Sequence, residues 1–225
     1  MRKYRPTAFT LILCCALAAS SSSMVAAPGS QAAQGQGMRM SASPKTGMAE
    51  AALREAMRKL WSDHVIWTRD YVIAAVGDRP DQASAAARLL RNQDDIGAAV
   101  AGYYGKAAGD ALTSLLKAHI MIAVDLIKAA KAHDDAQYRT LNTRWQKNGE
   151  DIATFLSGAN SNWPKATLLD MMQMHLSTTT AEVVARLNGR WDDDVAAFDA
   201  VYAHILKMAD ALSDGIIKQF PSRFK

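Results

Sequence analysis

Three histidines stand at regular intervals along the chain, and imidazoles can bind metals, move protons or form hydrogen bonds inside a protein core. His64, His119 and His175 are 55 and 56 residues apart, and an apolar residue occupies the fourth position before each of them. A second polar residue follows each histidine after 28 or 29 positions: Asn92, Asn148 and His204. This spacing predicts a threefold internal repeat of about 55 residues.

The segments that carry these residues have the periodicity of helices. Apolar side chains recur at steps of three and four, and the alternation typical of strands is missing from the sequence. Short stretches with Gly, Pro, Asp or Asn separate six predicted helices: 49–76, 81–102, 106–132, 135–157, 164–187 and 191–219. The fold class is therefore predicted to be all-α, with three antiparallel hairpins in an up-and-down bundle.

The spacing also predicts where the polar residues lie in the bundle. In each hairpin the histidine and its partner are equally far from the predicted turn, so they should lie side by side in an antiparallel pair. All six side chains should then share one level of the core. Glu182 would add a carboxylate, because Tyr71 and Leu126 occupy the equivalent positions of the other two hairpins.

Two interpretations of this polar layer are open. The structural one is that each histidine bonds to its polar partner across the hairpin, since an unpaired buried polar group costs roughly 1–3 kcal/mol. The functional one is a site in the bundle core for a small organic or anionic ligand, or for zinc, copper or iron. The candidate ligand-binding residues are His64, Asn92, His119, Asn148, His175, Glu182 and His204.

A metal site would use the four histidines of the layer. Its ligands would be His64, His119, His175 and His204, with Glu182 as a further candidate ligand. Neither Glu-x-x-His nor His-Glu-x-x-His spacing is present, so the sequence does not name the metal.

Other polar residues are interpreted as surface groups. Arg69 is expected to pair with Asp63 or Asp70, although an arginine near the layer could also hold an anion. The sequence contains no Gly-rich phosphate loop, nucleophile elbow or pair of catalytic carboxylates.

The N-terminus has the pattern of a secretion signal. Three basic residues precede an apolar run from Ala8 to Ala19, which is shorter than the roughly 20 residues that span a bilayer. We predict a signal peptide over 1–27, a flexible Gly-, Ser- and Gln-rich lead-in over 28–48, and one helical domain over 49–225.

Export limits the chemistry of the mature chain. Cys14 and Cys15, the only cysteines, would leave with the signal, so thiol chemistry is not expected. The net charge would fall from +4 to +1, because the signal holds three basic residues and no acid. A nucleic-acid partner and a membrane span in the mature chain are therefore not expected, and the location should be periplasmic or secreted.

Several segments together resemble a family of bacterial exported helical-bundle proteins of uncharacterised function. The matching segments are Trp61–Arg69, Leu89–Gly97, Tyr103–Gly105, Asn162–Pro164, Met208–Ile216 and Gln219–Pro221. Members of that family are often labelled glycosyltransferase or acetylglutamate kinase. This chain lacks the alternating strands and helices and the nucleotide-binding loop that such labels need, so the resemblance implies a helical fold and no activity.

The preferred interpretation is an exported, non-enzymatic helical protein that binds a small ligand or another protein and has a buried His/Asn layer. The alternative is a periplasmic metal-binding bundle. A further alternative is an enzyme of unknown reaction.

Overall fold

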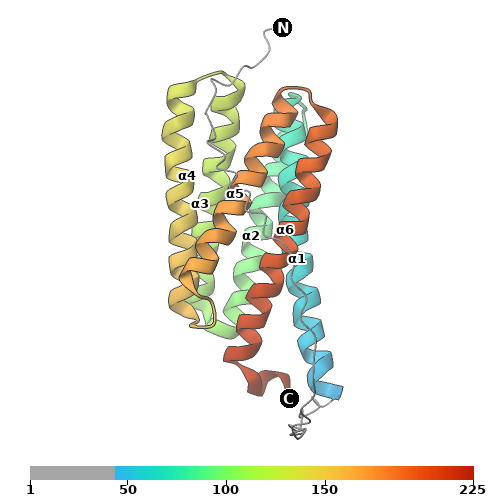
Figure 1. Ribbon diagram of the computed structural model, residues 1–225, viewed down its shortest axis with the longest axis vertical. Helices are drawn as coiled ribbons and strands as arrows, with labels where there is room; N and C mark the ends of the chain where they lie inside the picture. The colour runs from blue at the N-terminus through green and yellow to red at the C-terminus, as the bar shows by residue number, and fades with distance from the viewer. Residues whose placement is uncertain (1–43) are drawn as a thin grey trace, which may run out of the picture. The chain divides into compact units, whose positions relative to one another are not determined.

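The computed structural model describes residues 44–225 as a bundle of six α-helices (Figure 1). The helices are α1 (Pro44–Val76), α2 (Gln82–Tyr104), α3 (Lys106–Lys131), α4 (Asp135–Ala159), α5 (Lys165–Leu187) and α6 (Trp191–Gln219), followed by the short 3-10 helix η1 (Pro221–Phe224). The described residues contain no strand, so the all-α prediction is confirmed. The predicted signal peptide and most of the predicted lead-in lie outside these residues.

The predicted helix boundaries are accurate except at the first helix. Helices α2 to α6 begin and end within two residues of their predicted limits. Helix α1 begins at Pro44 and not at residue 49, so the last part of the predicted lead-in is helical. Proline suits the first turn of a helix, because the amide hydrogen that it lacks would have no partner there.

The six helices form a closed ring. Each helix packs against the next one in the chain, and α6 packs against α1. Helix α1 also contacts α3 and α5, so these odd-numbered helices approach one another inside the ring. The bundle is therefore a single closed unit and not a four-helix bundle with a separate hairpin.

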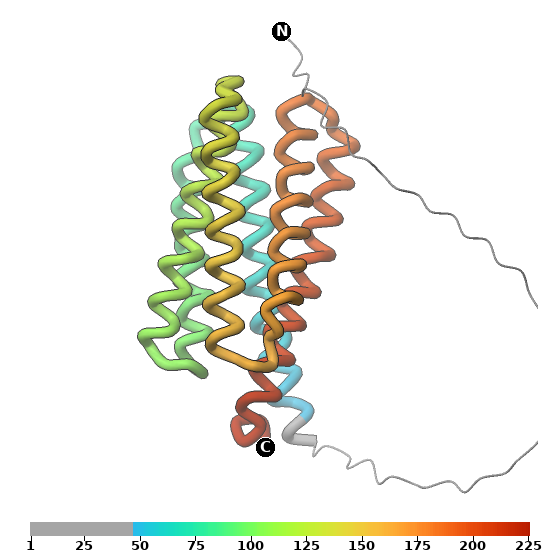
Figure 2. Tube along the Cα trace, turned by 60° about the vertical axis from the view of Figure 1, so that its left-hand side comes forward, coloured from blue at the N-terminus to red at the C-terminus, as the bar shows by residue number. Residues whose placement is uncertain are grey.

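The neighbouring pair α4 and α5 packs less extensively than any other pair around the ring. The two helices lie close together near the loop that joins them and diverge towards the opposite end (Figures 1 and 2). This seam is the place where the ring has the fewest interhelical contacts to break.

The three hairpin turns share one geometry. Each contains a residue with positive φ: Asp78 at 52°, His133 at 57° and Gly189 at 66°. The amide that follows each of them donates to the carbonyl five residues earlier, in the bonds Arg79–Ala74, Asp134–Ala129 and Arg190–Ala185. This pattern closes the end of a helix. The turn residues are 55 and 56 residues apart, as the histidines are.

Two glycines bring α2 and α3 close together. A Cβ atom on Gly97 would lie 1.8 Å from Thr113 Oγ1, and one on Gly109 would lie 2.6 Å from the Cβ of Ala101. Both values are far below normal contact distances, so the crossing of these helices depends on small residues.

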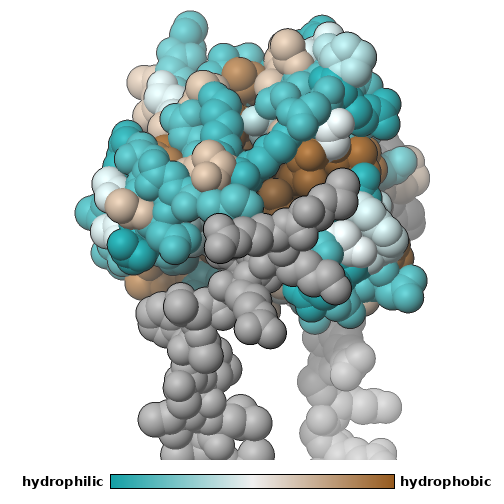
Figure 3. Space-filling model, turned by 90° about the horizontal axis from the view of Figure 1, so that it is seen from above, coloured by the Kyte–Doolittle hydropathy of each residue, from teal (hydrophilic) through white to brown (hydrophobic). Residues whose placement is uncertain are grey.

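Apolar side chains fill the interior of the ring. The largest group of buried residues includes Trp61, Ile152, Leu168, Ile205 and Ile216, which come from four of the six helices. The end of the bundle with the three hairpin turns has a mostly hydrophilic surface with a smaller hydrophobic area (Figure 3). No helix within residues 44–225 is long and apolar enough to cross a bilayer.

Candidate functional site

Three helices bring the repeated histidines into the core. His64 on α1, His119 on α3 and His175 on α5 each precede the positive-φ residue of their hairpin turn by 14 positions. Because the turns share one geometry, this equal spacing places the three side chains at the same distance from the ends of their helices. Their exposed fractions are 3%, 3% and 6%, so all three imidazoles are buried.

The three imidazoles are neighbours. The ring centroid of His175 lies 5.7 Å from that of His64 and 6.1 Å from that of His119. Tryptophan rings pack on the outer two, with Trp61 at 5.7 Å from His64 and Trp145 at 5.2 Å from His119. The odd-numbered helices thus supply an imidazole cluster, defined as His64, His119 and His175.

The second helix of every hairpin contributes one equivalent hydrogen bond. Its polar residue donates to the backbone carbonyl four positions before the histidine: Asn92 to Leu60 at 3.0 Å, Asn148 to Leu115 at 3.1 Å and His204 to Met171 at 2.9 Å. Each of these carbonyls belongs to an odd-numbered helix. The bond therefore ties the two helices of each hairpin together at the same height. That the three hairpins are copies of one unit stays a prediction.

The predicted bond between histidine and amide forms directly in the second hairpin. His119 Nδ1 lies 2.7 Å from Asn148 Oδ1. The prediction is wrong for the first hairpin, where Gln93 stands between the two residues. Gln93 Nε2 lies 3.3 Å from His64 Nδ1 and donates to Asn92 Oδ1 at 3.2 Å. The Gln93 side chain is longer than that of Asn92, so it occupies the position beside the His64 ring.

Gln93 is a residue that the sequence interpretation missed. It is completely buried, and its Oε1 has no hydrogen-bond partner among the residues that the structure describes. A signal for it exists in the sequence, because Gly149 and Ile205 occupy the corresponding positions after Asn148 and His204. When two of three equivalent positions hold a small or apolar residue and the third holds a polar one, the polar residue has a role specific to its own hairpin.

The third hairpin does not pair its two histidines. His204 is half-buried and uses its Nε2 for the carbonyl of Met171, so no bond joins it to His175. His175 Nδ1 is buried and has no hydrogen-bond partner within residues 44–225. His175 therefore has a free polar atom at the centre of the cluster.

Burial keeps the cluster uncharged near pH 7. Loss of solvation lowers the pKa of His64 to about 3 and that of His119 to about 4, and it lowers the pKa of His175 well below its ordinary value. Repulsion from the neighbouring imidazoles adds to the effect at His64 and His175, because a second positive charge nearby disfavours protonation.

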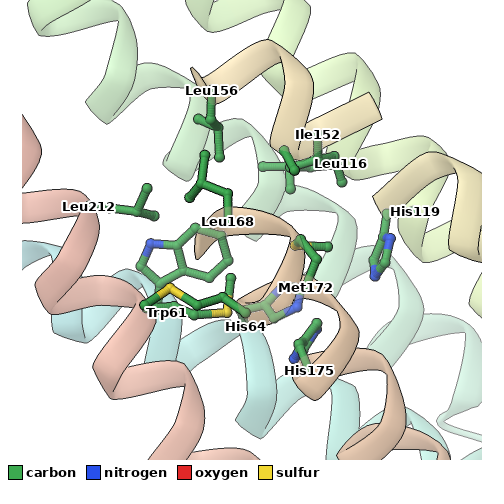
Figure 4. A pocket seen from close by; sticks show the side chains of 13 residues that line it. Trp61, His64, Leu116, His119, Ile152, Leu156, Leu168, Met172, His175 and Leu212 are labelled. Carbon is green, nitrogen blue, oxygen red and sulfur yellow. The ribbon is translucent and has the colours of Figure 1, made fainter. Parts of the chain in front are cut away.

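A small cavity lies beside the cluster. Its volume is about 20 Å³, and the three imidazoles share its wall with apolar side chains that include Trp61 and Met172. Figure 4 shows Trp61, His64, Met172 and His175 next to one another on one side, with Leu116, Ile152 and Leu156 across from them. A space of this size admits a molecule no larger than water while the surrounding side chains stay in place.

A second cavity of about 20 Å³ lies next to the first, deeper among apolar side chains. Five residues line both cavities: Trp61, Leu116, Ile152, Leu156 and Leu212. Trp163 also lines the second cavity. Its indole nitrogen and that of Trp61 are buried and form no hydrogen bond within residues 44–225. Movement of the shared side chains would join the two spaces into one.

Glu182 belongs to a different polar cluster. It is 1% exposed, and its carboxylate accepts a hydrogen bond of 2.7 Å from Arg69. Arg69 also donates to buried Asp194 at 3.0 and 3.1 Å, and Arg186 donates to Asp194 at 3.1 Å. The prediction that Glu182 joins the histidines is therefore wrong. Its local charge partner, Arg69, offers a stronger interaction than a neutral imidazole does.

The expected surface pairing of Arg69 with Asp63 or Asp70 is also wrong. Asp63 pairs with Lys59 at 2.7 Å, while Arg69 turns inward to Glu182 and Asp194 and stacks on Phe198 at 4.6 Å. We name Arg69, Glu182, Arg186 and Asp194 the charged cluster. Its two arginines face two carboxylates, so it has no spare positive group for an added anion.

The four histidines do not form a metal centre. Within residues 44–225, no group of three or more His, Cys, Asp or Glu side chains is arranged so that it could hold a metal ion. His204 is engaged with the Met171 carbonyl on its own side of the bundle, and Glu182 is engaged with Arg69. The geometry gives no support to the alternative of a zinc, copper or iron site.

Comparison of the chain with protein-family models, curated proteins and solved structures finds no match. The resemblance to exported helical-bundle proteins therefore stays a prediction.

Three of the segments that carry that resemblance meet at the end of the bundle opposite the hairpin turns. Tyr104 packs against Trp163 and Phe220, with ring centroids 5.5 and 5.2 Å apart. Asn160 Nδ2 donates to the Tyr104 hydroxyl at 2.8 Å, and burial raises the pKa of that phenol to about 12. These aromatic residues hold α2, the α4–α5 loop and the C-terminal segment together.

Proposed function

We propose that this protein is an exported, non-enzymatic binding protein, and that it takes a small, largely apolar molecule into the bundle core beside the imidazole cluster. The proposal depends on one observation. An apolar cavity is lined by His175 and Trp61, and within residues 44–225 the His175 Nδ1 and Trp61 Nε1 atoms are buried without a hydrogen-bond partner. Ligand sites in proteins are mostly apolar with a few converging polar groups.

The cavity must enlarge to admit an organic molecule, and its wall is suited to this. Met171, Met172 and Met208 line it. Methionine side chains are unbranched and adapt their shape at low cost, so they can withdraw or repack around a guest. The neighbouring second cavity offers further volume once the shared side chains move.

The seam between α4 and α5 is the natural route of entry. It has the least extensive packing in the ring, and Met172 and Leu176 of α5 face Gly149 of α4 across it. The Cβ of a residue at Gly149 would lie 3.4 Å or more from these side chains, which is ordinary contact and not the close fit found between α2 and α3. Separation of α4 from α5 therefore breaks fewer contacts than separation of any other neighbouring pair.

The contacts of the imidazoles favour binding over catalysis. His64 and His119 bond to amide side chains, and the buried carboxylates are engaged in the charged cluster. A general base needs a pKa near the working pH, and burial lowers the pKa of these rings far from it. Export is inferred from the signal-like N-terminus.

The test is a titration of the purified protein with toluene, followed through the methyl signals of ¹³C-labelled methionines. We expect the signals of Met171, Met172 and Met208 to shift with saturation. Three exposed methionines provide internal controls and should not shift: Met48, Met121 and Met174. Equal or absent shifts in the two groups would contradict a ligand site in the core.

A further inference from the structure

The hydrogen bonds around His119 determine which of its ring nitrogens carries the proton. Asn148 Nδ2 donates to the Leu115 carbonyl at 3.1 Å, which directs Asn148 Oδ1 towards His119 Nδ1 at 2.7 Å. The amide oxygen can only accept a hydrogen bond, so the proton lies on His119 Nδ1. The Nε2 atom of this neutral ring is therefore an acceptor.

The bonds around His64 determine the opposite tautomer. Asn92 Nδ2 donates to the Leu60 carbonyl, so Asn92 Oδ1 faces Gln93. The two protons of Gln93 Nε2 are shared among three acceptors: Asn92 Oδ1 at 3.2 Å, the Leu89 carbonyl at 2.9 Å and His64 Nδ1 at 3.3 Å. An amide nitrogen cannot accept a hydrogen bond, so a proton on His64 Nδ1 would have no acceptor at this contact. His64 Nδ1 is then the acceptor, and the proton lies on Nε2.

His175 stands between these two rings, and no hydrogen bond among the described residues fixes its own tautomer. Its centroid lies 5.7 Å from that of His64 and 6.1 Å from that of His119, and its Nδ1 has no partner in the described part of the chain. The side chain is 6% exposed and lines the cavity. The imidazole of His175 can therefore donate or accept at the cavity, whichever a guest requires.

We infer that the ligand of this site is a small uncharged molecule with an apolar body and one hydroxyl group, and that His175 binds the hydroxyl. This inference rests on the proposed function. A hydroxyl both donates and accepts, which suits a ring whose tautomer is free.

Charged molecules fit the cavity poorly. The arginines and carboxylates of the charged cluster bind each other, so they offer no counter-ion to a guest. Burial of an ion without a partner is far more costly than burial of a hydroxyl that forms one hydrogen bond. The ligand class is therefore that of phenols and apolar alcohols, and not of carboxylic acids or amines.

Phenol and toluene provide the test, because they differ in a single hydroxyl or methyl group. We expect phenol to bind about tenfold more tightly, the ratio that corresponds to one net hydrogen bond. Phenol, unlike toluene, should also shift the ring ¹⁵N signals of His175. The ¹⁵N signals should report a proton on Nε2 of His64 and on Nδ1 of His119, with and without phenol.

Two variants localise the effect. In His175→Leu the preference for phenol should disappear, and the bundle should persist because His175 Nδ1 forms no hydrogen bond with any part of residues 44–225. In His133→Asn, which removes a histidine from a hairpin turn, the preference should remain; asparagine tolerates the positive φ of this position.

The outcomes separate the two proposals. Equal affinity for phenol and toluene, or unchanged ¹⁵N signals of His175, would overturn the ligand class and leave the core site standing. If neither molecule shifts the signals of Met171, Met172 and Met208, both proposals are wrong. The ¹⁵N measurement uses the unaltered protein, so it decides the matter even if His175→Leu does not fold.

Discussion

Asn148 Oδ1 lies 2.7 Å from His119 Nδ1, and this contact joins α3 to α4 at the level of the cavity. The same amide donates to the Leu115 carbonyl, so one side chain satisfies two polar groups of the facing helix. Both Asn148 and His119 are buried, and water cannot replace either bond at low cost.

Replacement of Asn148 by leucine should therefore destabilise the bundle. His119 Nδ1 would lose its hydrogen-bond partner in the core, and we expect a loss of about 1–3 kcal/mol in the free energy of unfolding. Urea denaturation at pH 7.5 measures it. The exposed residue Gln146 on the same helix gives the control, and Gln146→Leu should change the free energy far less. Equal losses in the two variants would contradict the importance of the bond.

Acid should destabilise the protein through the imidazole cluster. The pKa values of these rings in the folded protein, about 3 for His64 and about 4 for His119, lie below their value of 6.5 in the unfolded chain. Below pH 6.5 the unfolded chain therefore binds more protons, and stability falls with pH by about 1.4 kcal/mol per pH unit for each ring. Denaturation midpoints between pH 7.5 and 4.5 measure this dependence.

His175→Leu should lose less stability over the same pH range, because one proton fewer is bound on unfolding. Glu182 acts in the opposite direction: burial raises its pKa to about 7, so its contribution to stability is lost as pH rises through that value. Glu182→Gln should therefore make the acid-induced loss steeper. A pH dependence that is the same in all three proteins would contradict the assignment.

Gly215 is expected to tolerate no larger residue. A Cβ atom at this position of α6 would lie 1.9 Å from Trp163 Nε1, and the indole is buried and cannot move freely. We expect Gly215→Ala to cost about 1–3 kcal/mol through overpacking. In Gly102→Ala the added methyl meets no atom within 4 Å, and the higher helix propensity of alanine should raise stability by about 0.5–1 kcal/mol. Thermal unfolding of both variants tests the contrast in sign.

Removal of Arg69 should leave two buried carboxylates without their main counter-ion. Glu182 and Asp194 are each 1% exposed, and Arg69 bonds to both of them. We expect Arg69→Met to cost about 3–5 kcal/mol. Arg69→Lys should restore little, because an ammonium group cannot contact both carboxylates with the geometry of a guanidinium.

The control for Arg69 is Arg58, whose guanidinium bonds to Asp210 on the exposed surface at 2.6 and 2.7 Å. Arg58→Met should leave the denaturation midpoint nearly unchanged, because exposed ion pairs contribute little. A comparable loss in both arginine variants would show that the burial of Glu182 and Asp194 does not matter.

Periodicity was sufficient to predict the fold, because each hairpin carries two signals: the apolar spacing of its helices and the turn residues between them. Apolar residues at steps of three and four define the buried face of a helix, and the turn residues Asp78, His133 and Gly189 interrupt it at matching intervals. The predicted start of α1 lies five residues too far along the chain, because the Gly- and Ser-rich composition before residue 49 does not resemble that of a helix, and α1 begins at Pro44.

The candidate site was harder to predict, because sequence spacing fixes the height of a side chain along the bundle but not the direction in which it points from its helix. The sequence placed His64, His119 and His175 at one level, and the structure shows them in contact. It could not show that Gln93 intervenes at His64, because adjacent residues on a helix point about 100° apart and either can reach a neighbouring ring.

Glu182 was misassigned for an electrostatic reason. Its partner Arg69 comes from a helix that is far away in the sequence, 113 residues before Glu182, and Arg69 reaches Asp194 over a separation of 125 residues. Helical periodicity carries no information on such charge pairs, and a guanidinium attracts a carboxylate more strongly than a neutral ring does.

Closure of the ring between α1 and α6 has a consequence for the order of the chain. The two helices pack antiparallel, and η1 contacts both, so the part of α1 drawn in blue in Figure 2 begins at the end of the bundle where the C-terminal residues lie. A short linker could join them, and a circular permutant opened at the His133 turn would keep every helix beside its present neighbours. The connectivity of the polypeptide is thus one of several that would satisfy the same set of side-chain contacts.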